Sequence, residues 1–261
     1  MTSHSNTYFQ SRGRARLGIV VPFSNTNLEP DMQMLRPNGI SLHFARAGGY
    51  DLDEVPDSDQ IRGFALASLD EVITSLAAAR PNVYIYGCTS ATLAHGPEFD
   101  QEFAQKISDM VDGKPAITAA GALVLALKTL GAKNIGFSSP YVEALNEEAI
   151  EFLGKSGFET VSSAYVGEDL GNQGQGEVTP ERVVELGLAA DSPQAEAIVL
   201  SCTDMRAVEA IEELEQRLGK PVVTSNQALM FAAAKLLNLT DEEVVPAGQL
   251  FAYLNKNPII V

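Results

Sequence analysis

The sequence predicts an α/β protein made of two similar doubly wound lobes, each with its own parallel sheet, and a ligand site between them. Strand-like and helical segments alternate along the chain, which is typical of parallel sheets covered by helices. The two halves also repeat one plan. Each half has one cysteine at the end of a short apolar run. Cys88 ends the run of residues 83–88, and residues 197–200 lead into Ser201-Cys202. Runs of this kind are typical of buried parallel strands.

Two further sequence marks support the repeat. Gly18 and Pro22 of the first half match Gly136 and Pro140 of the second. Downstream of the cysteines, Gly-Lys-Pro-x-x-Thr occurs at residues 113–118 and again at residues 219–224. Marks in the same order indicate lobes related by an approximate twofold axis.

The repeat predicts the domain organisation. We expect lobe 1 at residues 16–120 and lobe 2 at residues 121–224, with residues 225–261 packing back on lobe 1. Residues 1–15, which are rich in Ser, Asn and Arg, are expected to form a flexible N-terminal tail.

Residue patterns predict the individual elements. Short apolar or alternating runs predict strands at residues 17–22, 40–45, 83–88, 116–118, 134–138, 159–166, 197–200 and 222–224. Helical periodicity, with Gly and Pro at the boundaries, predicts helices at residues 28–35, 61–79, 98–111, 119–130, 142–154, 180–190, 204–218 and 226–238.

Two long loops are expected between these elements. The acidic segment 48–59 lies near the carboxyl end of a strand and is a candidate lid. The glycine-rich segment 167–176 follows a strand, but the next helix begins only after Thr179-Pro180. Because a phosphate-binding fingerprint needs a tight strand–turn–helix, this segment is not expected to bind a nucleotide.

Composition limits the partners. The chain has 261 residues, 45% of them hydrophobic, and a net charge of −16. Nucleic acid is an unsuitable partner because phosphate binding needs a basic surface. No apolar run approaches the ~20 residues of a membrane helix, so no membrane partner is expected. The polar N-terminus does not resemble a signal peptide, which favours the cytoplasm and free thiols. Two cysteines and three histidines do not suggest a zinc site.

A thiol where a strand meets a helix has a physical reason to react. Unpaired backbone N–H groups and the helix dipole would favour the thiolate of Cys88 and of Cys202, and the same donors bind carboxylates. Facing thiols suit proton abstraction on one side of a small acid and donation on the other. Equally, one thiolate can add to an activated double bond while the other thiol supplies a proton. The plain alternative is that both cysteines are ordinary buried residues.

Polar residues at the same sheet edge are candidate ligands. Thr89 and Thr203 each follow a cysteine and could donate a hydroxyl to a thiolate or to substrate. Ser24 and Asn25 follow the first strand and are expected on the same rim. Asn25 could equally cap the next helix.

Several motifs together resemble a known family. They are Pro22-x-Ser24-Asn25-Thr26, the two strand-end cysteines, Pro140-Tyr141 and Ser201-Cys202. This set resembles the aspartate/glutamate racemase superfamily over about residues 16–239, with the maleate cis-trans isomerases as the nearest branch together with the arylmalonate decarboxylases.

The resemblance implies a cofactor-free, metal-free isomerase that acts on a small dicarboxylate and forms a homo-oligomer. It implies that Cys88 adds to the alkene carbon of maleate and that Cys202 is the general acid/base. Asn25, Tyr141 and Asn172 match family positions that hold the substrate carboxylates.

The chain departs from each branch at some position. Asp204 stands where glutamate racemases have histidine, and Cys88 stands where arylmalonate decarboxylases lack a cysteine. Thr89-Ser90 replaces the apolar residues that follow the first cysteine of maleate isomerases. Three alternatives therefore remain: an amino-acid racemase that uses the thiols as paired acid and base, a non-catalytic binding protein on the same scaffold, and a redox switch.

Overall fold

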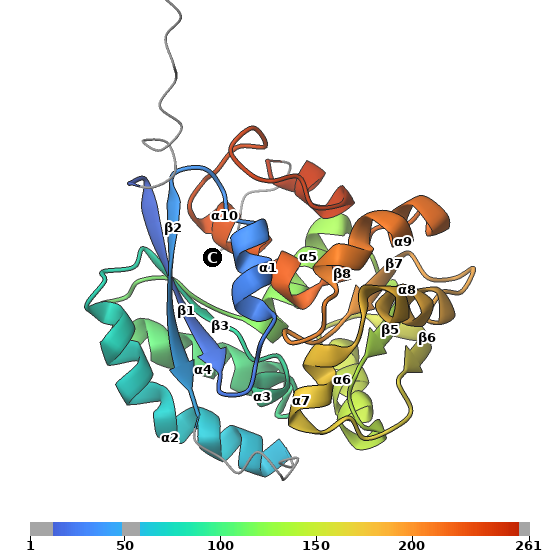
Figure 1. Cartoon of the computed structure of the whole chain (residues 1–261), viewed down its shortest axis with the longest axis horizontal. Coiled ribbons are helices and arrows are strands. Elements are labelled where there is room, and N and C mark those ends of the chain that lie inside the picture. The colour runs from blue at the N-terminus through green and yellow to red at the C-terminus, as the bar shows by residue number, and fades with distance from the viewer. Residues whose placement is uncertain (1–12, 49–57, 256–261) are drawn as a thin grey trace, which may run out of the picture.

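The protein consists of two four-stranded parallel sheets, as the computed structural model shows for residues 13–48 and 58–255 (Figure 1). The first sheet has the order β2-β1-β3-β4 and the second has the order β6-β5-β7-β8. In chain order the strands are β1 (Ala15–Pro22), β2 (Ile40–Ala47), β3 (Val83–Tyr86), β4 (Ala116–Thr118), β5 (Asn134–Ser139), β6 (Glu159–Tyr165), β7 (Ala197–Leu200) and β8 (Val222–Thr224). The predicted α/β class with two parallel-sheet lobes is confirmed.

The two sheets share pairing as well as strand order. Leu17 of β1 pairs with Val83 of β3, and Ile135 of β5 pairs with Ala197 of β7. β3 and β7 are buried along their whole length, which explains their continuous apolar sequence. The parallel register brings the carboxyl ends of β3 and β7 to one edge of their sheets. Cys88 lies two residues after the end of β3, and Cys202 lies two residues after the end of β7.

Helices cover both sheets. They are α1 (Leu28–Met34), α2 (Ser58–Ala77), α3 (Ser90–Leu93), α4 (Gly96–Met110), α5 (Ala119–Leu130), α6 (Glu143–Lys155), α7 (Gly171–Glu177), α8 (Pro180–Ala189), α9 (Ile211–Leu218) and α10 (Ser225–Leu236), with 3₁₀ helices η2 (Val208–Ala210) and η3 (Gln249–Tyr253). No helix within the described ranges is both long and apolar enough to cross a bilayer.

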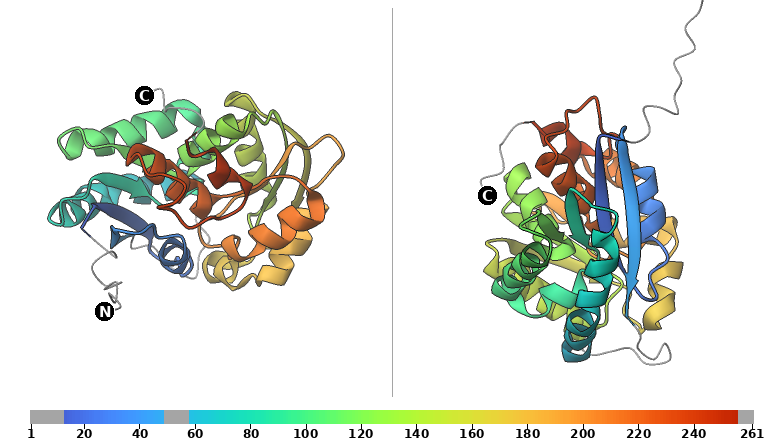
Figure 2. Two further views of the ribbon diagram at one scale, coloured as in Figure 1. Left: turned by 90° about the horizontal axis from the view of Figure 1, so that it is seen from above. Right: turned by 90° about the vertical axis from the view of Figure 1, so that its left-hand side faces the viewer.

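The centre of the molecule is a helix pair, α5 and α10, between the two sheets (Figures 1 and 2). Both helices begin at the threonine of the repeated Gly-Lys-Pro-x-x-Thr element. Thr118 caps α5 by accepting the N–H of Gly121, and Thr224 caps α10 by accepting that of Gln227. α10 also packs against α1, β3 and β4, so a helix from the end of the chain covers the first sheet.

Two predicted segments differ from the structure. The segment expected as a glycine-rich loop contains the helix α7. This helix was not predicted because glycine has a low helix propensity, and tertiary contacts stabilise it instead. The helix expected at residues 204–218 begins only at η2 and α9. The carbonyls of Thr203 and Asp204, which would accept the first helical hydrogen bonds, instead accept Nδ2 of Asn226 and Asn27.

Two expectations concern residues outside the described ranges, and one short helix was not predicted. Residues 49–57 of the candidate lid and residues 1–12 of the expected tail lie outside the described ranges. α3 was not predicted because four residues are too few to show a helical period.

A buried carboxyl lies where α1 meets α10. Asp31 is 3% exposed and accepts a hydrogen bond from Asn226 Nδ2 at 2.7 Å. Burial, partly opposed by this hydrogen bond, raises the pKa of Asp31 to about 7. The native state therefore binds a proton at a pH where the unfolded chain has released it.

We expect Asp31→Asn to change how stability depends on pH. Since the folded pKa is raised, the wild-type free energy of unfolding should fall relative to the variant as the pH rises from about 4 to about 7, by up to about 4 kcal/mol. Urea unfolding at several pH values measures the difference. Asp70→Asn, at an exposed position of α2, is the control. A constant difference between wild type and Asp31→Asn would contradict the expectation.

Candidate active site

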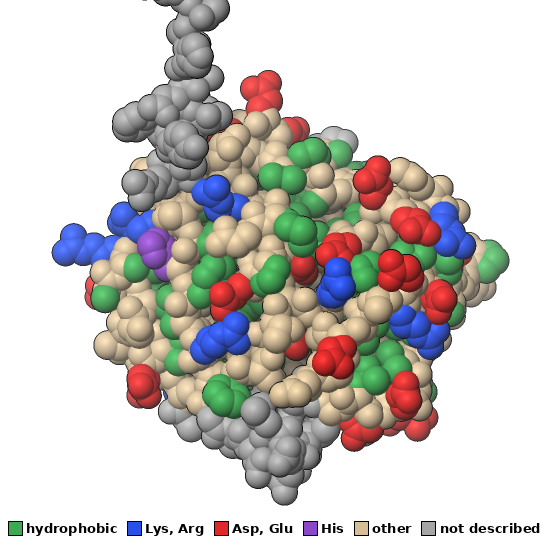
Figure 3. Space-filling view, in the orientation of Figure 1, with side chains coloured by type: hydrophobic (Ala, Val, Ile, Leu, Met, Phe, Trp, Pro, Cys, Tyr) green, Lys and Arg blue, Asp and Glu red, His purple; other side chains and the backbone are tan. Residues whose placement is uncertain are grey.

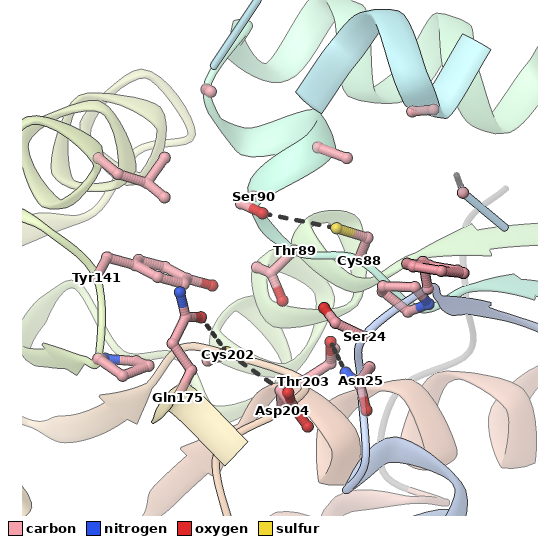
Figure 4. A pocket seen from close by; sticks show the side chains of 18 of the residues that line it. Ser24, Asn25, Cys88, Thr89, Ser90, Tyr141, Gln175, Cys202, Thr203 and Asp204 are labelled. Atoms are coloured by element: carbon pink, nitrogen blue, oxygen red, sulfur yellow. Dashed lines mark hydrogen bonds between the residues drawn. The ribbon is translucent and has the colours of Figure 1, made fainter. Parts of the chain in front are cut away.

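The cysteines lie in one cavity of about 700 Å³, a size that holds small organic ligands. Its wall comes from four turns at the carboxyl ends of β1, β3, β5 and β7, together with α2, α6 and α7. Seven of the eight predicted site residues line it: Ser24, Asn25, Cys88, Thr89, Tyr141, Cys202 and Thr203 (Figure 4). The eighth, Asn172, is on α7, but its side chain is outside the described part of the structure.

Cys88 lies at the start of the β3–α3 turn and is only partly buried. Its Sγ is 3.6 Å from Ser90 Oγ. Burial raises the pKa of the Cys88 thiol, although the Ser90 hydroxyl and the backbone N–H groups of Ala91 and Ser90 oppose the shift. The expectation that the helix start favours the Cys88 thiolate is wrong in direction, because α3 is a single turn and desolvation outweighs its donors.

Cys202 is more buried and holds its proton more firmly. Its Sγ donates to Gln175 Oε1 at 3.5 Å and accepts the N–H of Asp204 at 3.3 Å. Burial, followed by the negative charge of Asp204, raises the pKa of Cys202 to about 12. The predicted preference for a Cys202 thiolate is therefore also wrong, since no helix begins at this turn and a carboxylate lies beside the sulfur. At neutral pH Cys202 is therefore a thiol rather than a thiolate.

Tyr141 brings a phenol close to both sulfurs. It is buried, and burial followed by the nearby Cys202 raises its pKa well above the usual value, so the phenol stays neutral. Its backbone is fixed: the Tyr141 N–H donates to Ser139 Oγ, and the Tyr141 carbonyl accepts from Asn146 Nδ2. A neutral O–H held in place can donate to a carboxylate.

Asn25 joins the two halves. Its Oδ1 accepts the backbone N–H groups of Asn27 and Leu28, and its Nδ2 donates to Thr203 Oγ1 at 3.1 Å. An amide nitrogen has two hydrogens, so the second is left for a ligand as far as the described residues show. Asn25 thus helps to begin α1 and also faces the cavity, which combines the two roles weighed from the sequence.

The two threonines have partners within the protein. Thr203 donates its hydroxyl proton to the carbonyl of Gly87 at 2.8 Å, across the halves. Thr89 donates to Ser225 Oγ of α10 at 3.1 Å. Each threonine hydroxyl therefore has its proton directed to the protein rather than to a thiolate. Ser24 lines the cavity beside Asn25.

Asp204 and Gln175 are site residues that the sequence did not reveal. Asp204 Oδ1 accepts the backbone N–H groups of Thr26 and Asn27 at 2.7 and 3.0 Å. Gln175 comes from α7, in a segment whose glycines indicated a loop. A signal existed for Asp204, since it lies two residues after a strand-end cysteine, but its partners lie in the other half.

The charge of the cavity limits how an anion can bind. None of the described residues that line the cavity is lysine or arginine. Four acidic residues line it: Asp59, Glu148, Asp169 and Asp204. A carboxylate must therefore be held by neutral O–H and N–H donors. No group of three or more potential metal ligands occurs among the described residues. Acidic side chains are also prominent on the outer face over α8 and α9 (Figure 3).

We expect iodoacetamide to modify Cys88 well before Cys202. Both thiols have raised pKa values, so each should react more slowly at pH 8 than an exposed cysteine, and the Cys88 rate should still rise above pH 9. Mass spectrometry of tryptic peptides after timed quenching measures both rates. Cys88→Ser, which leaves Cys202 alone, is the control. Faster labelling of Cys202 would contradict this order.

Two parallel-sheet lobes that each bring one thiol to a shared cavity are the arrangement of the aspartate/glutamate racemase superfamily. Within that class, the chain belongs to the arylmalonate decarboxylase family, whose model matches residues 17–251.

Known relatives cover almost the whole chain. The maleate isomerase of Geobacillus stearothermophilus is 29% identical over 253 residues, which is 91% of this chain and 97% of the relative. The maleate isomerase of Pseudomonas putida is 29% identical over 254 residues, with the same coverage. Among solved structures, a Cys-to-Ser variant of the Nocardia farcinica maleate cis-trans isomerase with a covalently bound succinylcysteine intermediate aligns with a TM-score of 0.83. It is 24% identical and covers 91% of this chain and 98% of its own.

Proposed function

We propose that the protein catalyses the cis–trans isomerisation of maleate to fumarate, without a bound cofactor. The observation that carries the proposal is one cavity containing two unlike thiols. Cys88 is the more accessible and is beside hydrogen-bond donors, whereas Cys202 retains its proton because its pKa is about 12. A nucleophile and an acid are the two groups that addition to an alkene requires. Similarity to maleate isomerases supports the substrate.

The proposed reaction begins at Cys88. Because burial raises the pKa of Cys88, its thiol must first release its proton to solvent. The thiolate then forms a bond from sulfur to C2 of maleate, and the π electrons move toward C3. C3 takes the proton of the Cys202 thiol, which leaves a succinyl group on Cys88 and a thiolate on Cys202. The Ser90 hydroxyl and the backbone N–H groups of Ser90 and Ala91 stabilise the reactive Cys88 anion, because these groups lower its pKa.

Rotation about the new C2–C3 single bond carries the carboxylates to opposite sides. The Cys202 thiolate then removes a proton from C3, the C–H electrons form the double bond, and the bond between C2 and the Cys88 sulfur breaks. Fumarate leaves, and both sulfurs return to their starting protonation states. The buried Asp204 charge makes the Cys202 thiolate costly, so the thiolate recovers a proton readily.

Neutral donors would hold the two carboxylates. We assign this role to the remaining amide hydrogen of Asn25, the Tyr141 phenol and Ser24, with Asn172 as a further ligand from α7. Thr89 and Thr203 would act through the positions of the turns that carry them, since their hydroxyl protons go to Ser225 and Gly87.

The test is proton NMR of the protein with maleate in deuterated water. A loss of maleate signal matched by a gain of fumarate, unchanged by a chelator, is the expected result. Aspartate, glutamate and an arylmalonate should be tested in parallel. Solvent exchange at Cα of an amino acid would favour racemisation, and loss of carbon dioxide from the arylmalonate would favour decarboxylation. Either outcome without maleate turnover would overturn the proposal.

Cysteine variants should separate the two sulfur roles. Cys88→Ala should lower kcat by more than about 10³-fold, because no nucleophile remains. Cys202→Ala should also be inactive, yet retain a covalent adduct on Cys88 with the added mass of maleic acid, visible by intact-protein mass spectrometry. Unchanged thermal unfolding of both variants is the control. Turnover near wild type in Cys88→Ala would exclude the nucleophile assigned here.

The organisation of the chain completes the proposal. We propose lobes at residues 16–120 and 121–224 related by an approximate twofold axis, with the C-terminal segment returning to lobe 1. The packing of α10 on α1, β3 and β4 supports this division. We further propose that the protein is a cytoplasmic homo-oligomer. Light scattering after gel filtration would give the mass of the oligomer.

A further inference from the structure

Gln175 has an arrangement that the two cysteine roles do not explain. Its Oε1 is 3.5 Å from the Cys202 sulfur and accepts the thiol hydrogen. Figure 4 places the amide inside the cavity, between Cys202 and Tyr141. Gln175 is therefore next to the one group that must release and recover a proton in the proposed reaction.

Hydrogen bonds from outside α7 fix the position of Gln175. Asn27 Nδ2 donates to the carbonyl of Gly176 at 2.9 Å and to the carbonyl of Asp204 at 2.6 Å. One side chain from the first half thus fastens α7 to the Cys202 turn.

The packing beside Gln175 is also close. A Cβ on Gly176 would lie 2.7 Å from Thr26 Oγ1 and 3.1 Å from Asp204 Oδ2, so a side chain there would push α7 away. The absence of a side chain at residue 176 lets α7 approach near enough for Gln175 to reach the sulfur.

An amide suits a sulfur that changes its protonation state. A thiol needs an acceptor, which the carbonyl oxygen provides, and a thiolate needs a donor, which the N–H₂ end of the same group provides after rotation about the last side-chain bond. A carboxylate at the same place could only accept and would repel a thiolate that already lies beside Asp204.

We propose that Gln175 is a positioning residue for the Cys202 proton, directing the S–H through Oε1 and donating through Nε2 to the sulfur once the proton has left. This inference rests on the proposed function for its role in turnover. Its effect on the Cys202 thiol needs no substrate.

The experiment compares Gln175→Leu and Gln175→Glu with Gln173→Leu and Gln173→Glu. Gln173 is an exposed residue of the same helix that does not line the cavity. For each variant, kcat and KM with maleate are measured. In a second arm, with Cys88→Ala added to each variant and to the wild type, the rate of Cys202 alkylation by iodoacetamide is measured at pH 9.

The expected changes affect kcat and thiol reactivity, not substrate affinity. Gln175→Leu should lower kcat by about tenfold or more with KM changed less than about threefold. Gln175→Glu should lower kcat further and slow Cys202 alkylation by about tenfold or more, since an added negative charge disfavours the thiolate. The Gln173 variants should match their parents in both arms.

Two results would overturn the inference. Alkylation of Cys202 that is equal in Gln175→Glu and its parent would show that Gln175 does not act on the sulfur. A raised KM with unchanged kcat would make Gln175 a substrate ligand instead. If no variant or wild type turns over maleate, the proposed function fails, and the alkylation arm still decides whether Gln175 controls Cys202.

Discussion

The hydrogen-bonded joint between the loop after β1 and the turn after β7 is the constraint on which the site depends. Asp204 accepts two backbone N–H groups of that loop, and Asn27 returns a hydrogen bond to the Asp204 carbonyl. Asn25 adds a further bond to Thr203, which in turn holds the Gly87 carbonyl beside Cys88. These bonds are buried or partly buried, where an unmade bond is costly. They connect the turns that carry the two cysteines.

The same joint explains the protonation of the site. The carboxylate of Asp204 satisfies N–H groups of the loop, and the same residue lies beside the Cys202 sulfur. Together with burial it holds the proton on Cys202. A carboxylate that also holds the loop after β1 therefore helps to keep one of the two thiols protonated. No carboxylate among the described residues contributes to the pKa shift of Cys88, and the donors around it partly oppose the effect of burial. The two thiols differ because their surroundings differ, although their positions in the two sheets match.

The acidic surface and the lack of a lining lysine or arginine have a common consequence. A dicarboxylate receives no cationic partner from the described lining, so binding must come from fixed neutral donors. Preorganised dipoles of this kind act strongly where water is excluded. They also leave a bound dicarboxylate free of a tight ion pair, which is compatible with the rotation of one carboxylate in the proposed isomerisation.

Much of the fold followed from local sequence. Apolar runs of strand length, the repeated Gly-Lys-Pro-x-x-Thr element and the cysteine at each strand end were enough to predict two parallel-sheet lobes and most of the cavity wall. These features are local because burial on both faces and helix capping require particular residues at neighbouring positions. α7 and the turn after Cys202 were mistaken because their conformations depend on hydrogen bonds to Asn27 and Asn226, far away in the sequence.

By itself, the sequence predicted seven of the residues that line the cavity, since strand ends and turns fix where a side chain begins. Only the tertiary structure decided what those side chains do there. The protonation of Cys88 depends on desolvation, and that of Cys202 on desolvation and on Asp204. Which hydrogens of Asn25, Thr89 and Thr203 are already donated within the protein depends on partners far away in the sequence. Electric fields and hydrogen bonds act through space, so residues distant in the chain set the chemistry of neighbours in the fold.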